Sequence, residues 1–322
     1  MRLCTDILKR EVDGRYERVK KFLGDFQKNG ALTLMAAPAL VLMILFRYLP
    51  IGGIILAFKR FTIPKGIFGS SWIGFENFKF LFLTKDAFII TRNTLCYNAV
   101  FIVLNLICAV AMAIGLNELP KKRTAKVYQT IFMAPYFLSW VAISFIAFAF
   151  LNKDGGLLNM LIRKTGGTEI SWYSQTTYWP LIIVIAQLWK NLGYATVMYL
   201  SSLVNIPQEL YEAALVDGAT KWQQIRTITL PALRPMMIIL TIIAIGRIFY
   251  SDFGLFYQLP RNSGPLFDVT NVIDTYVYRT LKDLNDIGMA AAANLYQSLL
   301  GFLMIIGSNA LIKKIDADSA LF

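Results

Sequence analysis

The sequence predicts an all-α membrane protein with about six membrane-spanning helices, and two observations carry this prediction. The 322-residue chain is 56% hydrophobic, whereas a soluble domain is usually about 45–50% apolar. Its apolar residues are gathered in long runs, and a helix needs roughly 20 such residues to cross a bilayer. The predicted spans are residues 31–57, 91–116, 127–150, 180–203, 235–256 and 289–312.

The first predicted span is the longest and contains an interruption. Pro50, Gly52 and Gly53 lie near its end, and such a group can kink a helix or end it. Residues 50–90 are too many for a simple turn, so we expect an ordered external cap there. The predicted organisation is a basic tail 1–30, a membrane domain 31–316 and a short C-terminal tail 317–322.

The distribution of basic residues predicts that both termini lie in the cytoplasm. With the N-terminus inside, the cytoplasmic segments hold 17 Lys and Arg residues in 81 positions, and the external segments hold 11 in 103. Most of this bias comes from the tail 1–30 and the turn at 121–123. Basic residues close to span ends weigh most in setting orientation. The number of spans then places the loop 206–231 in the cytoplasm.

The composition disfavours several functional classes. The chain has no histidine, and its three cysteines show no zinc or redox spacing, so no catalytic residue of these kinds and no metal site is expected. No G-x-x-x-x-G-K-[ST] stretch is present, so no phosphate-binding P-loop is predicted. The net charge of +12 would suggest nucleic acid as a partner of a soluble protein. Here the basic residues lie at the ends of apolar runs and indicate membrane orientation instead.

The loop 206–231 has the signals of an ordered helical hairpin outside the bilayer. Pro207 can open a short helix because its missing N–H would have no helical partner there. Gly218 can stop that helix, since glycine takes the left-handed conformation at little cost. Thr220 can cap a second helix. Two interpretations remain open from these residues alone: a hairpin packed on the protein's own helices, or a docking surface for another protein.

The same stretch resembles the cytoplasmic signature of ABC-importer permeases. That signature reads Glu-Ala-Ala, three residues, Gly, nine residues, Ile, one residue, Leu-Pro, and the match here has no departure. The resemblance implies the type I importer architecture, with the hairpin as a coupling helix seated in a groove of a cytoplasmic ATPase. The predicted coupling residues are Glu212, Ala213, Ala214, Asp217, Gly218, Ala219, Ile228, Leu230 and Pro231.

Four further stretches resemble the carbohydrate, or maltose-type, branch of that family. WIGFENF begins at Trp72 and MAPYFLSW at Met133, and they resemble first-loop and third-span motifs. WKNLGY begins at Trp189 and YSDFGLFYQL at Tyr250, and they resemble motifs of the subgroup for polysaccharide or complex oligosaccharide uptake. The resemblance covers roughly residues 31–316 and implies transport of a saccharide across the bacterial plasma membrane.

The resemblance also implies partners and cofactors. A second homologous permease would complete the pathway as a heterodimer, two ATP-binding subunits would attach in the cytoplasm, and an external solute-binding protein would deliver the sugar. Membrane lipid would surround the spans, and no nucleic acid would bind. ATP and magnesium would be used by the partner ATPase, so this chain would hold no cofactor and would not be an enzyme.

Polar residues within the predicted spans are candidates for a translocation pathway. An ionisable residue at mid-membrane costs roughly 2.5–3.5 kcal/mol on insertion scales and therefore usually faces the bundle interior. The candidates are Gln187, Trp189, Lys190, Asn191, Tyr194, Arg247, Tyr250, Asp252, Asn294 and Gln297. A polar and aromatic lining suits sugars. The competing interpretation is a structural network between helices, with Lys190 paired to Asp252.

Rival functions follow from the same features. The chain could be an ABC-importer permease for a solute other than a sugar. A secondary transporter is the less favoured alternative, because inverted repeats and midspan helix breaks are not evident in the sequence. A third alternative, a membrane enzyme, is strongly disfavoured by the absence of histidine and of catalytic motifs.

Overall fold

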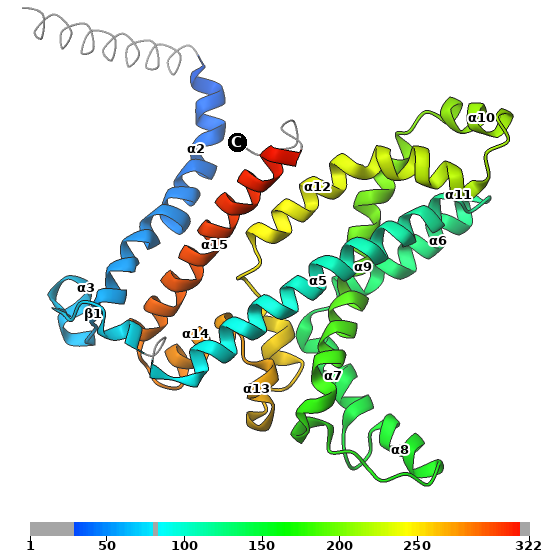
Figure 1. Ribbon diagram of the computed structural model, residues 1–322. Coiled ribbons are helices and arrows are strands. Elements are labelled where there is room, and N and C mark those ends of the chain that lie inside the picture. The colour runs from blue at the N-terminus through cyan, green and yellow to red at the C-terminus, as the bar shows by residue number, and fades with distance from the viewer. Residues whose placement is uncertain (1–28, 80–82, 316–322) are drawn as a thin grey trace, which may run out of the picture. The chain divides into compact units, whose positions relative to one another are not determined.

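The computed structural model describes residues 29–79 and 83–315, and helices dominate this part of the chain (Figure 1). Nearly all of the predicted tail 1–30, and all of the tail 317–322, lie outside the described residues. The chain divides into two units, Met1–Ile55 and Leu56–Phe322. Each unit is described by itself.

The first unit contributes an apolar helical segment. α2 (Gly30–Met43) continues through the π-helix η1 (Ile44–Tyr48) into the 3₁₀-helix η2 (Leu49–Phe58). The helix tightens where the predicted interruption lies, because Pro50 has no N–H for an α-helical bond. Gly30–Phe58 as a whole is long and apolar enough to cross a membrane. No residue of α2 is buried within the described part of the chain.

The second unit begins with the ordered cap that the sequence predicts. β1 (Lys59–Arg60) and β2 (Ser71–Trp72) pair antiparallel, with Lys59 opposite Trp72. The Lys59 ammonium is buried and donates to the carbonyl oxygens of Ile67 and Phe68, each at 3.0 Å. These bonds close the loop between the strands. Its remaining short elements are η3 (Ile63–Lys65), α3 (Gly66–Gly69) and η4 (Glu76–Phe78).

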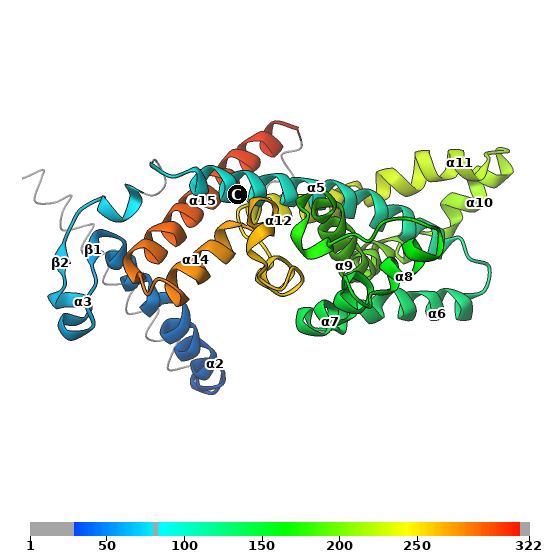
Figure 2. The ribbon, with the colours of Figure 1, turned by 90° about the horizontal axis from the view of Figure 1, so that it is seen from below.

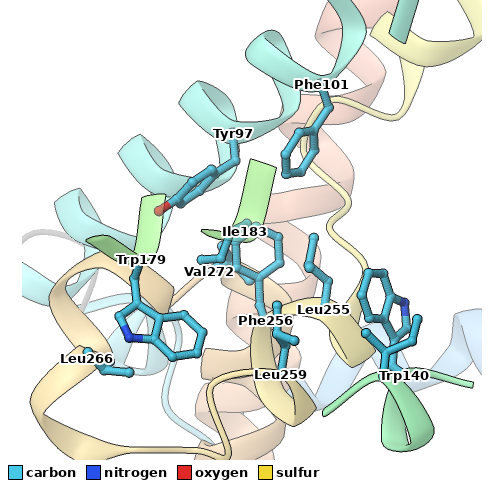
Figure 3. Close-up of a cluster of buried hydrophobic side chains, with 11 residues drawn as sticks. Tyr97, Phe101, Trp140, Trp179, Ile183, Leu255, Phe256, Leu259, Leu266 and Val272 are labelled. Carbon is cyan, nitrogen blue, oxygen red and sulfur yellow. The ribbon is translucent and has the colours of Figure 1, made fainter. Parts of the chain in front are cut away.

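The core of the second unit forms between α5 (Lys85–Asn117) and α9 (Trp179–Val204). Both helices are long and apolar enough to span a bilayer. Aromatic rings from several elements fill the space beside them, as Figure 3 shows. The buried cluster consists of Tyr97, Phe101, Trp140, Ile143, Trp179, Ile183, Leu255, Phe256, Leu259, Leu266 and Val272.

The third predicted span is not one helix, and the prediction of a continuous helix over 127–150 was wrong. α6 (Lys122–Met133) runs into the 3₁₀-helix η5 (Ala134–Phe137), and α7 (Trp140–Leu151) starts at an angle of 97° to them. Pro135 lies inside the turn, and the Ser139 hydroxyl caps α7 by accepting from the Ala142 N–H at 3.2 Å. Both features favour a new helix start here.

The segment that joins α7 to α9 is ordered around one buried side chain. It contains α8 (Leu157–Lys164), η6 (Trp172–Ser174) and η7 (Thr176–Tyr178). The fully buried amide of Asn159 donates to the Lys153 and Ile170 carbonyls, and its oxygen accepts from the Trp172 indole at 3.1 Å. This satisfied hub holds the loop together.

The fifth predicted span, 235–256, is also not one helix, although no such break is evident in the sequence. α12 (Leu230–Gly246) ends ten residues before the predicted limit of 256. The chain leaves helical geometry after Gly246 and resumes it in the π-helix η9 (Gly254–Gln258). The elements that follow are η10 (Gly264–Leu266), α13 (Phe267–Thr270), α14 (Ile273–Lys282) and α15 (Ile287–Ile315).

In the described residues, five helical segments are long and apolar enough to cross a membrane, or six if α6 to α7 counts as one bent span. This agrees with the predicted number. The loop between α9 and α12 forms α10 (Gln208–Val216), α11 (Lys221–Gln224) and the π-helix η8 (Ile225–Thr229). α11, η8 and α12 form the helical segment Lys221–Gly246, and Figures 1 and 2 both show α10 beyond the end of α9.

Candidate functional site

The hairpin of α10 and α11 ends its first helix on a glycine, as predicted. Gly218 has φ of +78°, and the Gly218 N–H donates to the Leu215 carbonyl at 3.0 Å. The Ala219 N–H donates to the Ala214 carbonyl at 2.9 Å. Together these bonds form a Schellman motif, which satisfies the carbonyl groups left open at a helix end. A Cβ at Gly218 would meet nothing within 4 Å, so a side chain there would strain the backbone without a clash inside this chain.

The second helix of the hairpin starts at a capping box. The Thr220 N–H donates to Gln223 Oε1 at 2.7 Å, and the Thr220 hydroxyl accepts from the Gln223 N–H at 3.4 Å. The Thr220 cap that the sequence predicts is therefore present. The π-turn of η8 follows, and its Thr229 hydroxyl lies 2.9 Å from the hydroxyl of Tyr211 on α10. This contact joins the two arms of the hairpin.

An ion pair joins the hairpin to the turn that follows α5. Lys221 Nζ lies 3.0 Å from a carboxylate oxygen of Glu118, just after α5. A cavity of about 640 Å³ lies next to this pair. Its lining includes Lys122 and Lys126 of α6 together with Tyr211 and Glu212 of α10. The inner side of α10 therefore faces open space rather than the packed interior.

The hairpin also exposes large apolar side chains. No residue of α10 is buried. Val216 is 87% exposed, Trp222 is 70% exposed and Leu215 is 66% exposed. A group of large apolar residues outside the membrane-spanning segments is typical of a protein-protein contact surface. Sequence reasoning missed Val216 and Trp222 as surface residues, although their position around the Gly218 turn could have indicated it.

Of the predicted coupling residues, most lie open on the hairpin. Glu212, Ala213, Asp217 and Gly218 are exposed, and Ala214 and Ala219 are half-buried. Ile228, Leu230 and Pro231 belong to η8 and the start of α12. The signature residues thus extend from the exposed turn into the base of the fifth span. Their role in coupling stays a prediction.

The break after α12 lies beside the middle part of α15, a helix that is long and apolar enough to cross a membrane. It packs on α15, which has 29 residues. Gln297 of α15 donates to the Phe249 carbonyl at 2.7 Å, and a Cβ on Gly246 would lie 3.0 Å from Ile305. Counted from Ile287, Gln297 and Ile305 are the eleventh and nineteenth residues of α15. At about 1.5 Å per residue, the break is therefore far from both ends of that span.

Side chains from other helices satisfy the backbone of this break. Asn98 of α5 donates to the carbonyl oxygens of Ile248 at 2.7 Å and Tyr250 at 3.2 Å. The Ser251 N–H donates to the Asp274 carboxylate at 2.7 Å. Irregular backbone inside a membrane needs such partners, because lipid offers none. Sequence reasoning missed Asn98 and Asp274, since neither lies in a motif that signals a broken helix.

Lys190 holds the other break, between η5 and α7. Its buried ammonium donates to the carbonyl oxygen of Tyr136 at 2.9 Å and also to that of Leu138. The ammonium also lies 5.4 Å from the ring centroid of Trp140, within cation–π range. A charged lysine at this depth is thus stabilised by two carbonyl dipoles and an aromatic face.

The predicted ion pair between Lys190 and Asp252 is not formed, and no salt bridge joins them in the described residues. Instead, Asp252 Oδ2 accepts from the Trp140 indole N–H at 2.5 Å. Asp252 Oδ1 accepts from the Gly254 N–H at 2.9 Å. Trp140 therefore stands between the two charges. It also fits against Gly254, where a Cβ would lie 2.2 Å from the indole ring.

The remaining pathway candidates differ in exposure, and several of them also make contacts within the chain. Tyr194 stacks on Tyr136 with ring centroids 4.8 Å apart, and the Tyr250 hydroxyl lies 3.3 Å from that of Ser298. Gln297 is buried, and its amide donates to the Phe249 carbonyl and to the Asp274 carboxylate. Gln187 and Asn191 are half-buried and bonded to each other at 2.9 Å. The exposed candidates are Trp189, Tyr194, Arg247, Tyr250, Asp252 and Asn294.

The fold and the hairpin define a multi-pass membrane permease. The chain belongs to the family of binding-protein-dependent transport system inner membrane components, whose model matches residues 105–316. The matched region includes the hairpin and the broken fifth span. This confirms the predicted family, the fold class and the membrane location. The protein is the permease subunit of an ABC importer.

Named relatives and solved structures extend the comparison over nearly the whole chain. Protein LplB of Bacillus subtilis is 33% identical over 92% of this chain and 93% of its own. The polygalacturonan/rhamnogalacturonan transport system permease protein YteP of the same organism is 30% identical over 94% of each chain. A chain of a bacterial ABC transporter that imports the acidic polysaccharide alginate is 27% identical, with a TM-score of 0.83 over 92% of this chain and 99% of that one. A chain of a bacterial alginate ABC transporter in complex with an alginate pentasaccharide-bound periplasmic protein is also 27% identical, with a TM-score of 0.81 over 91% of this chain and 97% of that one.

Proposed function

We propose that this permease carries an oligosaccharide or polysaccharide fragment into the cell and receives its driving energy through the hairpin 206–231. The observation that carries the coupling proposal is the exposed apolar turn of the hairpin. Val216 and Trp222 stand 87% and 70% exposed on a backbone fixed by a Schellman motif and a capping box. A rigid surface of this kind suits a groove on another protein, because little ordering entropy is lost on docking.

The saccharide proposal is supported by the aromatic and polar side chains at the two breaks. Tyr194 and Tyr250 are each 43% exposed, and Trp189 is 46% exposed. Rings of this kind can stack on the C–H faces of sugars, while hydroxyl and amide groups can bond sugar hydroxyls. The relatives named for polygalacturonan and alginate transport add support from similarity.

The remaining partners follow from this proposal. A second homologous permease would complete the pathway, and α2, which buries none of its residues, offers an apolar surface for it or for lipid. Two ATPase subunits would hydrolyse ATP with magnesium in the cytoplasm, and an external solute-binding protein would deliver the saccharide. This chain would carry out no covalent chemistry and bind no cofactor of its own.

Co-purification tests the proposal. The full-length chain, tagged and extracted from native membranes in mild detergent, should bring down a second permease and an ATPase. The assembled complex, placed in liposomes with ATP inside, should take up saccharide supplied with its binding protein. A chain that purifies alone from intact membranes, or uptake that persists without ATP, would contradict the proposal.

A further inference from the structure

Arg247 is an exposed cation at the break, beside the middle part of α15. It directly follows α12, and its backbone N–H donates to the Ala244 carbonyl at 3.1 Å. A Cβ on the preceding residue, Gly246, would lie 3.0 Å from Ile305 of α15. Two residues after Arg247, the Phe249 carbonyl accepts from Gln297 of α15 at 2.7 Å. The position of the break along α15 therefore applies to Arg247 as well. A charged side chain facing lipid at this depth would be costly, so its surroundings must be a partner or a water-filled path.

No hydrogen bond or ion pair to the Arg247 guanidinium is formed within the described part of the chain. The carboxylates at the break are engaged elsewhere. Asp252 accepts from the Trp140 indole and the Gly254 N–H, and Asp274 accepts from the Ser251 N–H and from Gln297. The second cation nearby, Lys190, is saturated by carbonyl oxygens. The break thus presents one uncommitted positive charge.

We propose that Arg247 binds a carboxylate of the transported saccharide, and that the substrate is therefore acidic; this rests on the proposed saccharide pathway. A guanidinium presents parallel N–H donors that match the two oxygens of a carboxylate. Tyr250, three residues on and 43% exposed, offers a ring on which a sugar face can stack. A uronate unit carries both complementary groups, a carboxylate and an apolar sugar face. Arg247 would set the selectivity of the pathway for acidic over neutral saccharides.

Two other partners of the Arg247 guanidinium can be distinguished from a saccharide carboxylate. A carboxylate of the second permease could pair with Arg247, and then loss of the charge would loosen the permease pair. An anionic lipid headgroup is disfavoured because the break lies far from both ends of α15. The test must also avoid the selectivity of the external binding protein, which could mask that of the pathway.

The experiment measures equilibrium binding of saccharides to the complete purified importer without its binding protein. The probes are end-labelled pentamers of galacturonate and mannuronate and the same pentamers after reduction of their carboxyl groups. The wild-type importer should bind at least one acidic pentamer about tenfold more tightly than its reduced form, as expected for one charge-assisted contact. Arg247→Gln should remove that preference, and Arg247→Lys should retain part of it. Lys153→Gln, which removes one charge from the external loop, should bind like wild type.

Several results would overturn the inference. Equal binding of acidic and neutral pentamers by the wild type would do so, as would an acidic preference retained by Arg247→Gln. So would equal weakening of both probes by that variant, or separation of the two permeases. Saccharide uptake by the importer in liposomes distinguishes a failure of this inference from a failure of the proposed function. An importer that takes up neutral saccharide with ATP retains the proposed function and loses only the role of Arg247. An importer that takes up no saccharide, acidic or neutral, fails both.

Discussion

The indole nitrogen of Trp140 donates a hydrogen bond to Asp252 at 2.5 Å, and this bond joins the two broken spans of the permease. Trp140 is the first residue of α7, just after the break in the third span. Asp252 lies in the break of the fifth span and caps η9 through the Gly254 N–H. Lys190 completes the arrangement by lying over the same indole ring. The two irregular segments are thus held as one unit.

Removing the indole donor should loosen this unit. Trp140→Phe keeps most of the ring but leaves Asp252 without its donor, and a bond to a charged group contributes about 1.5–3 kcal/mol. We expect a lower thermal unfolding midpoint in detergent and reduced uptake. Trp172→Phe is the matched control, because it removes an indole donor to the neutral Asn159 in the loop between α7 and α9. An unchanged midpoint for Trp140→Phe would show that the bond contributes nothing.

Lys190 and Asp252 should be energetically coupled through Trp140 rather than directly. A double-mutant cycle with Lys190→Met and Asp252→Asn should give non-additive changes in unfolding free energy, as residues sharing a partner usually do. The same cycle in a Trp140→Ala background should become nearly additive. Equal coupling in both backgrounds would instead require a direct interaction between the two charges.

Two helical glycines in the spans should respond in opposite ways to alanine. A Cβ on Gly193 of α9 would lie 2.1 Å from the Phe132 carbonyl at the end of α6, whereas one on Gly115 of α5 would meet nothing within 4 Å. Gly193→Ala should therefore destabilise by about 1–3 kcal/mol through overpacking. Gly115→Ala should be neutral or stabilise by up to about 1 kcal/mol. The measurement is the thermal unfolding midpoint of both variants. Similar midpoints would contradict the close contact between α6 and α9.

The orientation is tested by chemical labelling in intact cells. In a cysteine-free background, a cysteine at Lys28 should resist a membrane-impermeant thiol reagent, because the basic tail should be cytoplasmic. A cysteine at Lys153, in the loop before α8, should react. Labelling at Lys28 with protection at Lys153 would reverse the orientation and place the hairpin outside the cell.

The sequence predicts the spans and the hairpin well because both depend on local signals. Apolar run length sets the position of a span, and Gly218 and Thr220 stop and start the hairpin helices through their own backbone bonds. The breaks at 138–139 and 247–253 could not be predicted in this way. They are stabilised by Lys190, Asn98 and Asp274, which come from helices distant in sequence.

Packing between distant segments also explains why the predicted ion pair between Lys190 and Asp252 was wrong. Depth along two helices brought Lys190 and Asp252 to a similar level, which made direct pairing reasonable. A tryptophan from a third element occupies the space between them, and only tertiary packing reveals it. Carbonyl groups freed by a helix break then replace the carboxylate as partners of the lysine.

Coupling through the hairpin is tested most directly by changing Gly218 against a control with the same backbone. Gly166, after α8, has φ of +77° and the same pair of closing bonds as Gly218, and a Cβ at either glycine would meet nothing within 4 Å. Valine at either position should therefore strain the backbone similarly, but only Gly218 lies on the proposed docking surface.

The decisive measurement is ATPase pull-down by the tagged permease from membranes with matched permease levels, with saccharide uptake recorded in the same cells. Gly218→Val should insert and pair with the second permease, yet lose most of the bound ATPase and abolish uptake. Glu212→Lys, which reverses an exposed charge on α10, should act in the same direction. Gly166→Val should retain the ATPase. Wild-type ATPase recovery and uptake with Gly218→Val would show that this hairpin does not couple the permease to its energy source.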